Sequence, residues 1–164
     1  MKKIFLISLT LLFLACSPGT SLPQEVHFKL DIEAKDTYVI QTPYHVTLSN
    51  QEALEGLKSM YIPIDIPYTR AELTNLTGNI DIDWKYSVKR GTYYLTMTPK
   101  KGTSIAVNTE LASFDITPLE PGYIAITFVN GDLEVLDEEG NNHAALSDHI
   151  EPRIEAIEQI AGKE

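Results

Sequence analysis

The amino-acid sequence predicts a mainly β protein, either an antiparallel β-sandwich or an open barrel. The clearest evidence is the segment 79–89, where apolar and polar side chains alternate strictly, as in a strand with one buried face. About nine such short segments recur roughly every 8–12 residues, a spacing typical of sandwiches and barrels. In addition, Arg90-Gly91 and Asn130-Gly131 each separate two extended segments, and both pairs predict tight hairpins.

The expected strands follow one another between short turns. Residues 26–33 and 37–48 form the first pair, and Pro43 interrupts the second of them. The segment 61–68 is also extended, but Pro63 and Pro67 lack N–H groups that would point to one side, which predicts an edge strand. The remaining strands are expected at 79–89, 92–98, 104–107, 113–116, 123–129 and 133–136.

Helix signals are few. Ser49 and Glu52 have the spacing of a capping box, which predicts a short helix at about 50–59. Thr69 and Glu72 repeat that signal before two leucines. Near the end of the chain, isoleucines and an alanine recur at helical spacing beside glutamates, which predicts a C-terminal amphipathic helix at about 149–161 that docks on the sheet.

The first sixteen residues have the layout of an export signal. Lys2 and Lys3 precede a mostly apolar run that ends before Ser17, well short of the roughly 20 apolar residues that a spanning helix needs. Phe13-Leu14-Ala15-Cys16 places a small residue directly before the single cysteine of the chain. This tetrapeptide resembles the lipobox of bacterial lipoproteins.

The resemblance implies cleavage before Cys16 and attachment of acyl chains such as palmitate. Residues 1–15 would then be a signal peptide, 16–24 a lipidated linker and 25–164 a single mainly β domain. Several acyl chains exceed the one-chain threshold for stable anchoring, so the expected location is a membrane of the bacterial cell envelope. In Gram-negative lipoproteins, a serine after the cysteine implies sorting to the outer membrane, on either its periplasmic or its surface face.

Composition and motifs exclude several classes of function. The net charge is −10 and becomes −12 without residues 1–15, which argues against a nucleic-acid partner. The basic pairs Lys89-Arg90 and Lys100-Lys101 fall at two different hairpin tips and form no common patch. A single cysteine excludes a disulfide framework, and the sequence contains no nucleotide-binding, nucleophile-elbow or zinc-protease motif. We therefore expect no cofactor and a non-catalytic protein.

Two groups of residues are candidates for binding. Tyr61, Tyr68 and Tyr94 are candidates for contact with a partner, because tyrosine gives rigid amphipathic contact area and two of them bracket the expected edge strand. The acidic segment 132–149 is the candidate metal site, with Asp137, Glu139, His143 and His149 as its possible ligands for Ca²⁺ or a transition metal.

Three functions are compatible with these observations. The first is a lipid-anchored envelope protein that acts as a binding or structural module for a protein or an envelope component. The second is a metal-binding lipoprotein that uses the segment 132–149. The third is an envelope hydrolase whose Ser, His and Asp residues come from distant parts of the chain.

Overall fold

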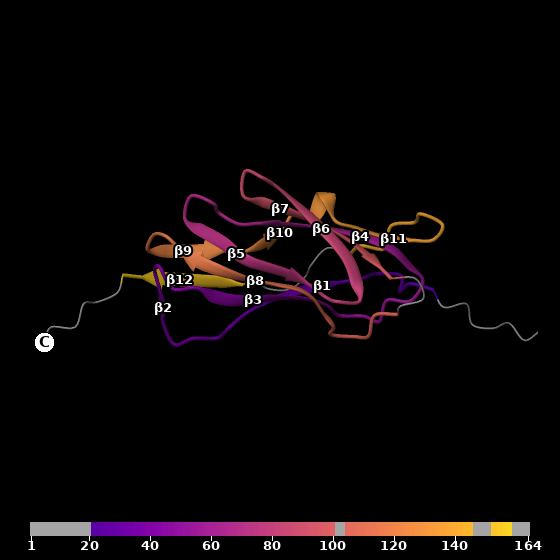
Figure 1. Cartoon of the computed structure of the whole chain (residues 1–164), viewed down its shortest axis with the longest axis horizontal. Helices are drawn as coiled ribbons and strands as arrows, with labels where there is room; N and C mark the ends of the chain where they lie inside the picture. The colour runs from indigo at the N-terminus through magenta and orange to yellow at the C-terminus, as the bar shows by residue number, and fades with distance from the viewer. Residues whose placement is uncertain (1–20, 101–103, 146–151, 159–164) are drawn as a thin grey trace, which may run out of the picture.

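The computed structural model describes residues 21–100, 104–145 and 152–158, and the regular structure in these ranges is almost entirely β (Figure 1). In chain order the described elements are β1 (Phe28–Ile32), β2 (Tyr38–Val39), β3 (Tyr44–Asn50), β4 (Leu57–Asp65), β5 (Ala71–Gly78), β6 (Ile82–Lys89), β7 (Thr92–Pro99), β8 (Glu110–Pro118), β9 (Gly122–Ala125), β10 (Thr127–Phe128), the 3-10 turn η1 (Asn130–Asp132), β11 (Glu134–Asp137) and β12 (Arg153–Ile157).

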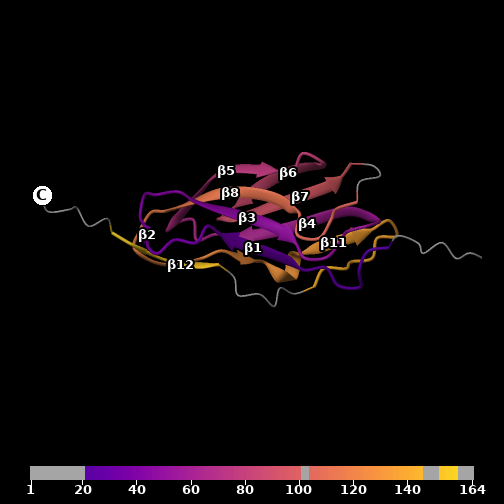
Figure 2. The same cartoon turned by 90° about the horizontal axis from the view of Figure 1, so that it is seen from below.

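The strands form two large facing sheets and one small sheet. The first large sheet has the order β1-β3-β8-β5, and the second has the order β10-β4-β7-β6, with β11 also paired to β4. The small sheet β2-β12-β9 lies at one end of the molecule. Figure 1 shows β4, β7 and β6 above β1, β3 and β8, and Figure 2, seen from below, shows the first sheet in the order β5, β8, β3, β1. The fold is therefore the β-sandwich of the two predicted alternatives, and it is open along the side where β5 and β6 end their sheets.

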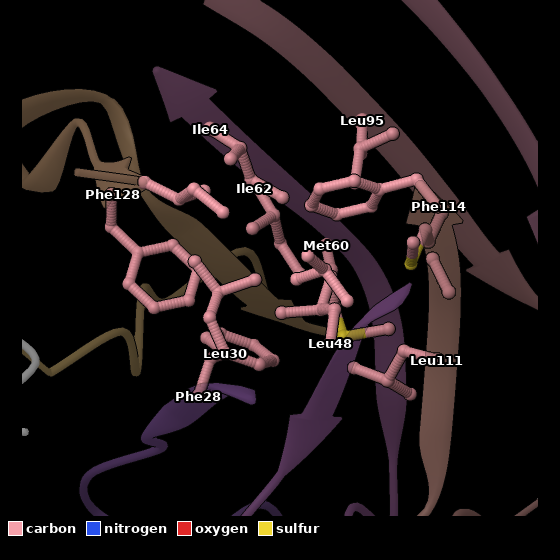
Figure 3. Packing of buried hydrophobic residues seen from close by; sticks show 14 of the residues in the cluster. Phe28, Leu30, Leu48, Met60, Ile62, Ile64, Leu95, Leu111, Phe114 and Phe128 are labelled. Atoms are coloured by element: carbon pink, nitrogen blue, oxygen red, sulfur yellow. The ribbon is translucent and has the colours of Figure 1, made fainter. Parts of the chain in front are cut away.

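The core lies between the two large sheets (Figure 3). It forms because alternate residues of each strand point inward, which is the period that the sequence shows. The fully buried side chains include Phe28, Leu48, Met60, Ile62, Ile64, Leu95 and Phe114. Phe28 and Phe128 contact each other across the core with their ring centroids 6.5 Å apart. Replacing a side chain such as Leu95 with alanine is expected to cost about 2–5 kcal/mol.

The prediction that Pro63 marks an edge strand is wrong. β4 lies inside its sheet, paired with β7 on one side and with β10 and β11 on the other. The Pro63 carbonyl accepts a hydrogen bond from the Val129 N–H at 3.0 Å, so the missing N–H of Pro63 faces the place where the chain leaves β10 for η1. The ladder is already interrupted there, and the sheet tolerates a proline.

The short helix expected at about 50–59 is also absent from the structure. Ser49 and Asn50 are the last residues of β3, and Gly56 has a φ of 69°, which a right-handed helix excludes. The Glu52 carboxylate caps no helix and instead accepts hydrogen bonds from the His27 backbone and imidazole. Thr69, which begins the second capping signal, lies in a turn at residues 68–70 that leads into β5.

The expected C-terminal helix at about 149–161 is replaced by a strand wherever the structure describes it. Within β12, Ile154 and Ala156 are buried and their neighbours are exposed, so the period is two. The strand pairs antiparallel with β9 and parallel with β2, which satisfies its backbone groups without a helix. Residues 149–151 and 159–161 lie outside the described ranges.

The hairpin expected at Asn130-Gly131 is not formed either. β10 and β11 do not pair with each other; both run antiparallel to β4, and η1 is an excursion between them. The Arg90-Gly91 hairpin is confirmed, because β6 and β7 pair along their whole length and both turn residues have positive φ angles of 51° and 87°.

The N-terminal end of the described chain is attached to the sandwich. Leu22 is buried, and the Val26 N–H donates to the His143 carbonyl at 2.8 Å. The packed domain therefore includes the end of the segment 16–24 that we expected to be a linker. Cys16 lies outside the described residues. No helix in the described part of the chain is long and apolar enough to cross a membrane.

Candidate functional site

The outer surface of the sheet β10-β4-β7-β6, which we call the outer face, is the best candidate for a binding site. Directly paired residues lie on the same side of a sheet, so the register defines this surface row by row. Its rows are Lys85, Thr96, Tyr61 and Glu134; then Ser87, Tyr94 and Pro63; then Lys89, Thr92, Asp65 and Thr127. The surface therefore consists mainly of hydroxyl and charged side chains around two tyrosines.

Tyr61 and Tyr94 form the centre of the outer face. They come from the neighbouring strands β4 and β7, and their rings stack with the centroids 5.8 Å apart and the planes 22° apart. Burial and the adjacent Tyr94 raise the pKa of the Tyr61 phenol, whose hydroxyl can donate a hydrogen bond. Two of the three tyrosines predicted to contact a partner are thus brought together.

Opposite charges flank this aromatic pair. Lys85 and Lys89 are exposed on β6, and Asp132 and Glu134 are exposed beside β4 on the other side. Between them, Thr92 donates a hydrogen bond to Asp65 at 2.9 Å. A surface with a rigid aromatic centre, many hydroxyls and a charged rim has the composition of a protein-contact surface.

Tyr68, the third predicted contact residue, lies elsewhere. It is 60% exposed in the turn between β4 and β5. With Leu73, Tyr93 and Leu119 it lines a hollow of about 300 Å³ at the open side of the sandwich. The structure therefore does not place Tyr68 on the same surface as Tyr61 and Tyr94.

In the predicted metal segment, the His143 imidazole hydrogen-bonds to Asp137 and to Pro23, an arrangement that we call the histidine clasp. The His143 Nε2 lies 2.9 Å from the Asp137 carboxylate, and its Nδ1 lies 2.8 Å from the Pro23 carbonyl. Both partners are acceptors, so both ring nitrogens donate when the ring is protonated. The Asp137 contact raises the pKa of His143, and the same hydrogen bond, together with Asn141, lowers the pKa of Asp137.

This clasp leaves no coordination site in the described part of the segment. A metal ligand needs a free imidazole nitrogen, whereas both nitrogens of His143 are in use. Glu139 is exposed at the turn, and His149 lies outside the described residues. Among the residues that the structure describes, no group of three or more potential ligands could hold a metal ion.

The other two described histidines also pair with carboxylates. His27 contacts Glu52 at 2.9 Å, and His45 contacts Asp115 at 3.0 Å. Asn75 donates a second hydrogen bond to Asp115, and the bonds from Asn75 and His45 lower the pKa of this carboxyl group. The hydrogen bonds of these described imidazoles go to carboxylates and carbonyls, not to a serine or threonine hydroxyl, so the geometry assembles no catalytic triad there.

One exposed aromatic row was missed by sequence reasoning. Strict alternation placed Trp84, Tyr86 and Val88 on a buried face, but Tyr86 is 51% exposed and Val88 is 50% exposed. Trp84, Tyr86 and Tyr93 are stacked in sequence, with centroids 6.1 and 6.3 Å apart. Alternation shows which residues share a face, but it does not show whether the facing sheet reaches far enough to cover them.

Comparison with known proteins identifies the class of fold. No protein-family model matches the chain, and no curated protein matches its sequence. Solved structures that it resembles are cohesin modules, so the chain has a cohesin-like β-sandwich fold.

Three of these structures show the extent of the resemblance. The cohesin module of a family 33 glycoside hydrolase from Clostridium perfringens has a TM-score of 0.64 and 16% identity, covering 82% of this chain and 99% of that one. The cohesin of a type I cohesin–dockerin complex from Clostridium thermocellum has a TM-score of 0.60 and 14% identity, covering 80% and 99%. A non-cellulosomal cohesin from the archaeon Archaeoglobus fulgidus has a TM-score of 0.58 and 16% identity, covering 79% and 91%.

Proposed function

We propose that this protein is a non-catalytic protein-binding module and that the outer face contacts the partner. The observation that carries the proposal is the stacked pair Tyr61 and Tyr94 at the centre of a sheet surface lined by hydroxyl side chains. Central aromatic anchors surrounded by polar groups contribute most of the binding energy in typical protein interfaces.

The resemblance in fold supports a protein as the partner. The Clostridium thermocellum neighbour was solved in complex with a dockerin, so this fold can present a surface to another protein domain. The rows of opposite charge on the outer face favour a partner surface with matching charges, basic opposite Glu134 and acidic opposite Lys85. The described residues contain neither a metal-ligand cluster nor a triad, so they give no support to the metal-binding or hydrolase alternatives.

The test of this proposal removes the aromatic pair. The partner is first captured by photo-crosslinking in the native cell from position 96, next to Tyr61, and is then purified. We expect the double variant Tyr61→Ser/Tyr94→Ser to bind this partner about 30-fold or more weakly, the loss typical of two interface anchors. Tyr123→Ser is the matched control, because Tyr123 is an exposed tyrosine on β9, away from the outer face. Equal weakening by both variants, or unchanged binding in the double variant, contradicts the proposal.

We further propose that the module is tethered to a membrane of a bacterial envelope through Cys16. Support comes from the resemblance of Phe13-Leu14-Ala15-Cys16 to a lipobox and from the apolar run before it. Growth with a radiolabelled fatty acid is expected to label the wild-type protein and not the Cys16→Ser variant. An unlabelled wild type refutes the tether and leaves the binding proposal standing.

A further inference from the structure

β6 is a free edge of its sheet. Within the described residues it pairs only with β7. The two-residue turn at Arg90-Gly91 makes Lys89 and Thr92 a hydrogen-bonded pair, so the odd-numbered residues of β6 bond to β7. The N–H and C=O groups of Trp84, Tyr86 and Val88 therefore point outward from the edge, where they can accept another strand.

Side chains on the inner side of this edge are also incompletely covered. Trp84 packs over β5, since a Cβ at Gly78 would lie 2.4 Å from its ring. Beyond it, Tyr86 and Val88 are about half exposed although they point to the inner side of the sandwich. A strand placed beside β6 would bury these apolar groups and pair its backbone in one step.

Charged side chains on the outer-face side of β6 indicate which strand can pair with it. The side chains that point to the outer face are Asp83, Lys85, Ser87 and Lys89. When a second β6 runs antiparallel about a two-fold axis at Tyr86, Asp83 faces Lys89 of the other copy twice and Lys85 faces Ser87 twice. Shifting the axis to Lys85 or to Ser87 instead places lysine opposite lysine, which is destabilising. An axis at Trp84 would place Asp83 opposite Lys85, but it would pair only residues 82–86 of β6, whereas an axis at Tyr86 pairs residues 83–89.

We propose that a second copy of this chain pairs through β6, with the two-fold axis at Tyr86. Two sandwiches then share one continuous sheet, in which Tyr86 faces Tyr86 of the other copy and Val88 faces Trp84 of the other copy. The charges of β6 complement those of a second, antiparallel β6. Pairing with an unrelated strand would not require this self-complementary order, so the order favours a second copy as the occupant. The inference does not require the proposed function, because the dimer pairs through the backbone edge of β6, whereas the aromatic pair Tyr61 and Tyr94 lies on β4 and β7.

Sedimentation of the purified full-length protein in detergent tests this dimer. We expect a monomer–dimer equilibrium in the wild type. Lys89→Asp turns two attractive pairs into two repulsive ones, which is expected to raise the dimer dissociation constant about 30-fold. The swap Asp83→Lys/Lys89→Asp is expected to restore dimerisation, whereas Lys85→Asp, which faces Ser87, is not expected to weaken it. Circular dichroism confirms that each variant is folded.

Several outcomes overturn the proposal. They are a wild type that is monomeric at every concentration, a dimer that is indifferent to Lys89→Asp, and a charge swap that fails to restore it. A dimer sensitive to Lys85→Asp instead places the axis at Trp84, where Asp83 would face Lys85, and refutes the axis at Tyr86.

A second measurement does not depend on the charges. In a Cys16→Ser background, Tyr86→Cys is expected to give a disulfide-linked dimer, because residues opposite each other at the axis have Cα atoms about 5.5 Å apart. Tyr94→Cys, on the outer face, is the control and is expected to form no disulfide-linked dimer. Equal crosslinking of both variants contradicts the proposed pairing, as does a Tyr86→Cys variant that does not crosslink. If the wild type is monomeric and binds an unrelated strand at β6, the proposed dimer is also refuted.

Discussion

Replacing Asn50 with aspartate is expected to destabilise the sandwich strongly at neutral pH. Asn50 is completely buried, and its Nδ2 donates to the carbonyls of Glu52 and Ala106 at 2.6 and 2.7 Å. Its Oδ1 accepts the Thr109 N–H at 3.0 Å. Aspartate keeps the acceptor but places an oxygen against two carbonyls. Two lost hydrogen bonds at about 1 kcal/mol each, plus the cost of an uncompensated buried charge, give a loss of about 3–5 kcal/mol.

The effect of Asn50→Asp has a characteristic pH dependence. Burial and the facing carbonyls raise the pKa of the new carboxyl group in the folded state above its unfolded value of about 3.9. The deficit is therefore smallest below that value, where the protonated carboxyl can still donate one hydrogen bond, and grows as pH rises toward the folded pKa. Asn50→Leu carries no charge, so its deficit is expected to be independent of pH. Urea unfolding of both variants at several pH values measures these quantities. A neutral-pH cost below about 1 kcal/mol, or the same pH dependence for both, refutes the reasoning.

Two further predictions concern the backbone turn and the clasp. Gly91 and Gly140 both have a φ of 87°, but a Cβ at Gly91 would lie 2.5 Å from a backbone oxygen, whereas at Gly140 nothing lies within 4 Å. Gly140→Ala is expected to cost about 1 kcal/mol and Gly91→Ala at least about 1 kcal/mol more in thermal unfolding; equal costs contradict this. The raised pKa of His143 makes its contribution complete below about pH 6.5 and lost as pH rises through the folded pKa. The lowered pKa of Asp137 makes its contribution present above about pH 4 and lost on further acidification. Corrected for intrinsic rates, hydrogen exchange at the Val26 amide, which bonds to His143, is therefore expected to be slowest between these limits; a flat profile refutes the clasp.

The sandwich itself could be predicted because its strands carry local signals. The alternation in β6 and the turn at Arg90-Gly91 are both properties of adjacent residues. The structure confirms the strand and the hairpin turn that they predict. The helix at about 50–59 was wrong because Asn50 is bound by residues 106 and 109, which no local pattern reveals. In β12 the buried Ile154 and Ala156 are too few to distinguish a period of two from a helical one.

The candidate site depended on information that a single strand does not contain. Tyr61 and Tyr94 are neighbours only because Pro63 pairs with Tyr94 in the β4–β7 register. His143 was a reasonable metal candidate by residue type, but its second partner, Pro23, is 120 residues away in the chain. The exposure of Tyr86 likewise follows from how far the opposite sheet extends.

Site-specific photo-crosslinking in the native cell tests the central claim most directly. A crosslinkable residue at Thr96, on the outer face, is compared with one at Thr47, on the outer side of the opposite large sheet. The proposed binding face predicts a discrete adduct from position 96 that disappears in the Tyr61→Ser/Tyr94→Ser background, and none from position 47. An adduct from position 47 alone, or one from position 96 that persists without the two tyrosines, contradicts the account.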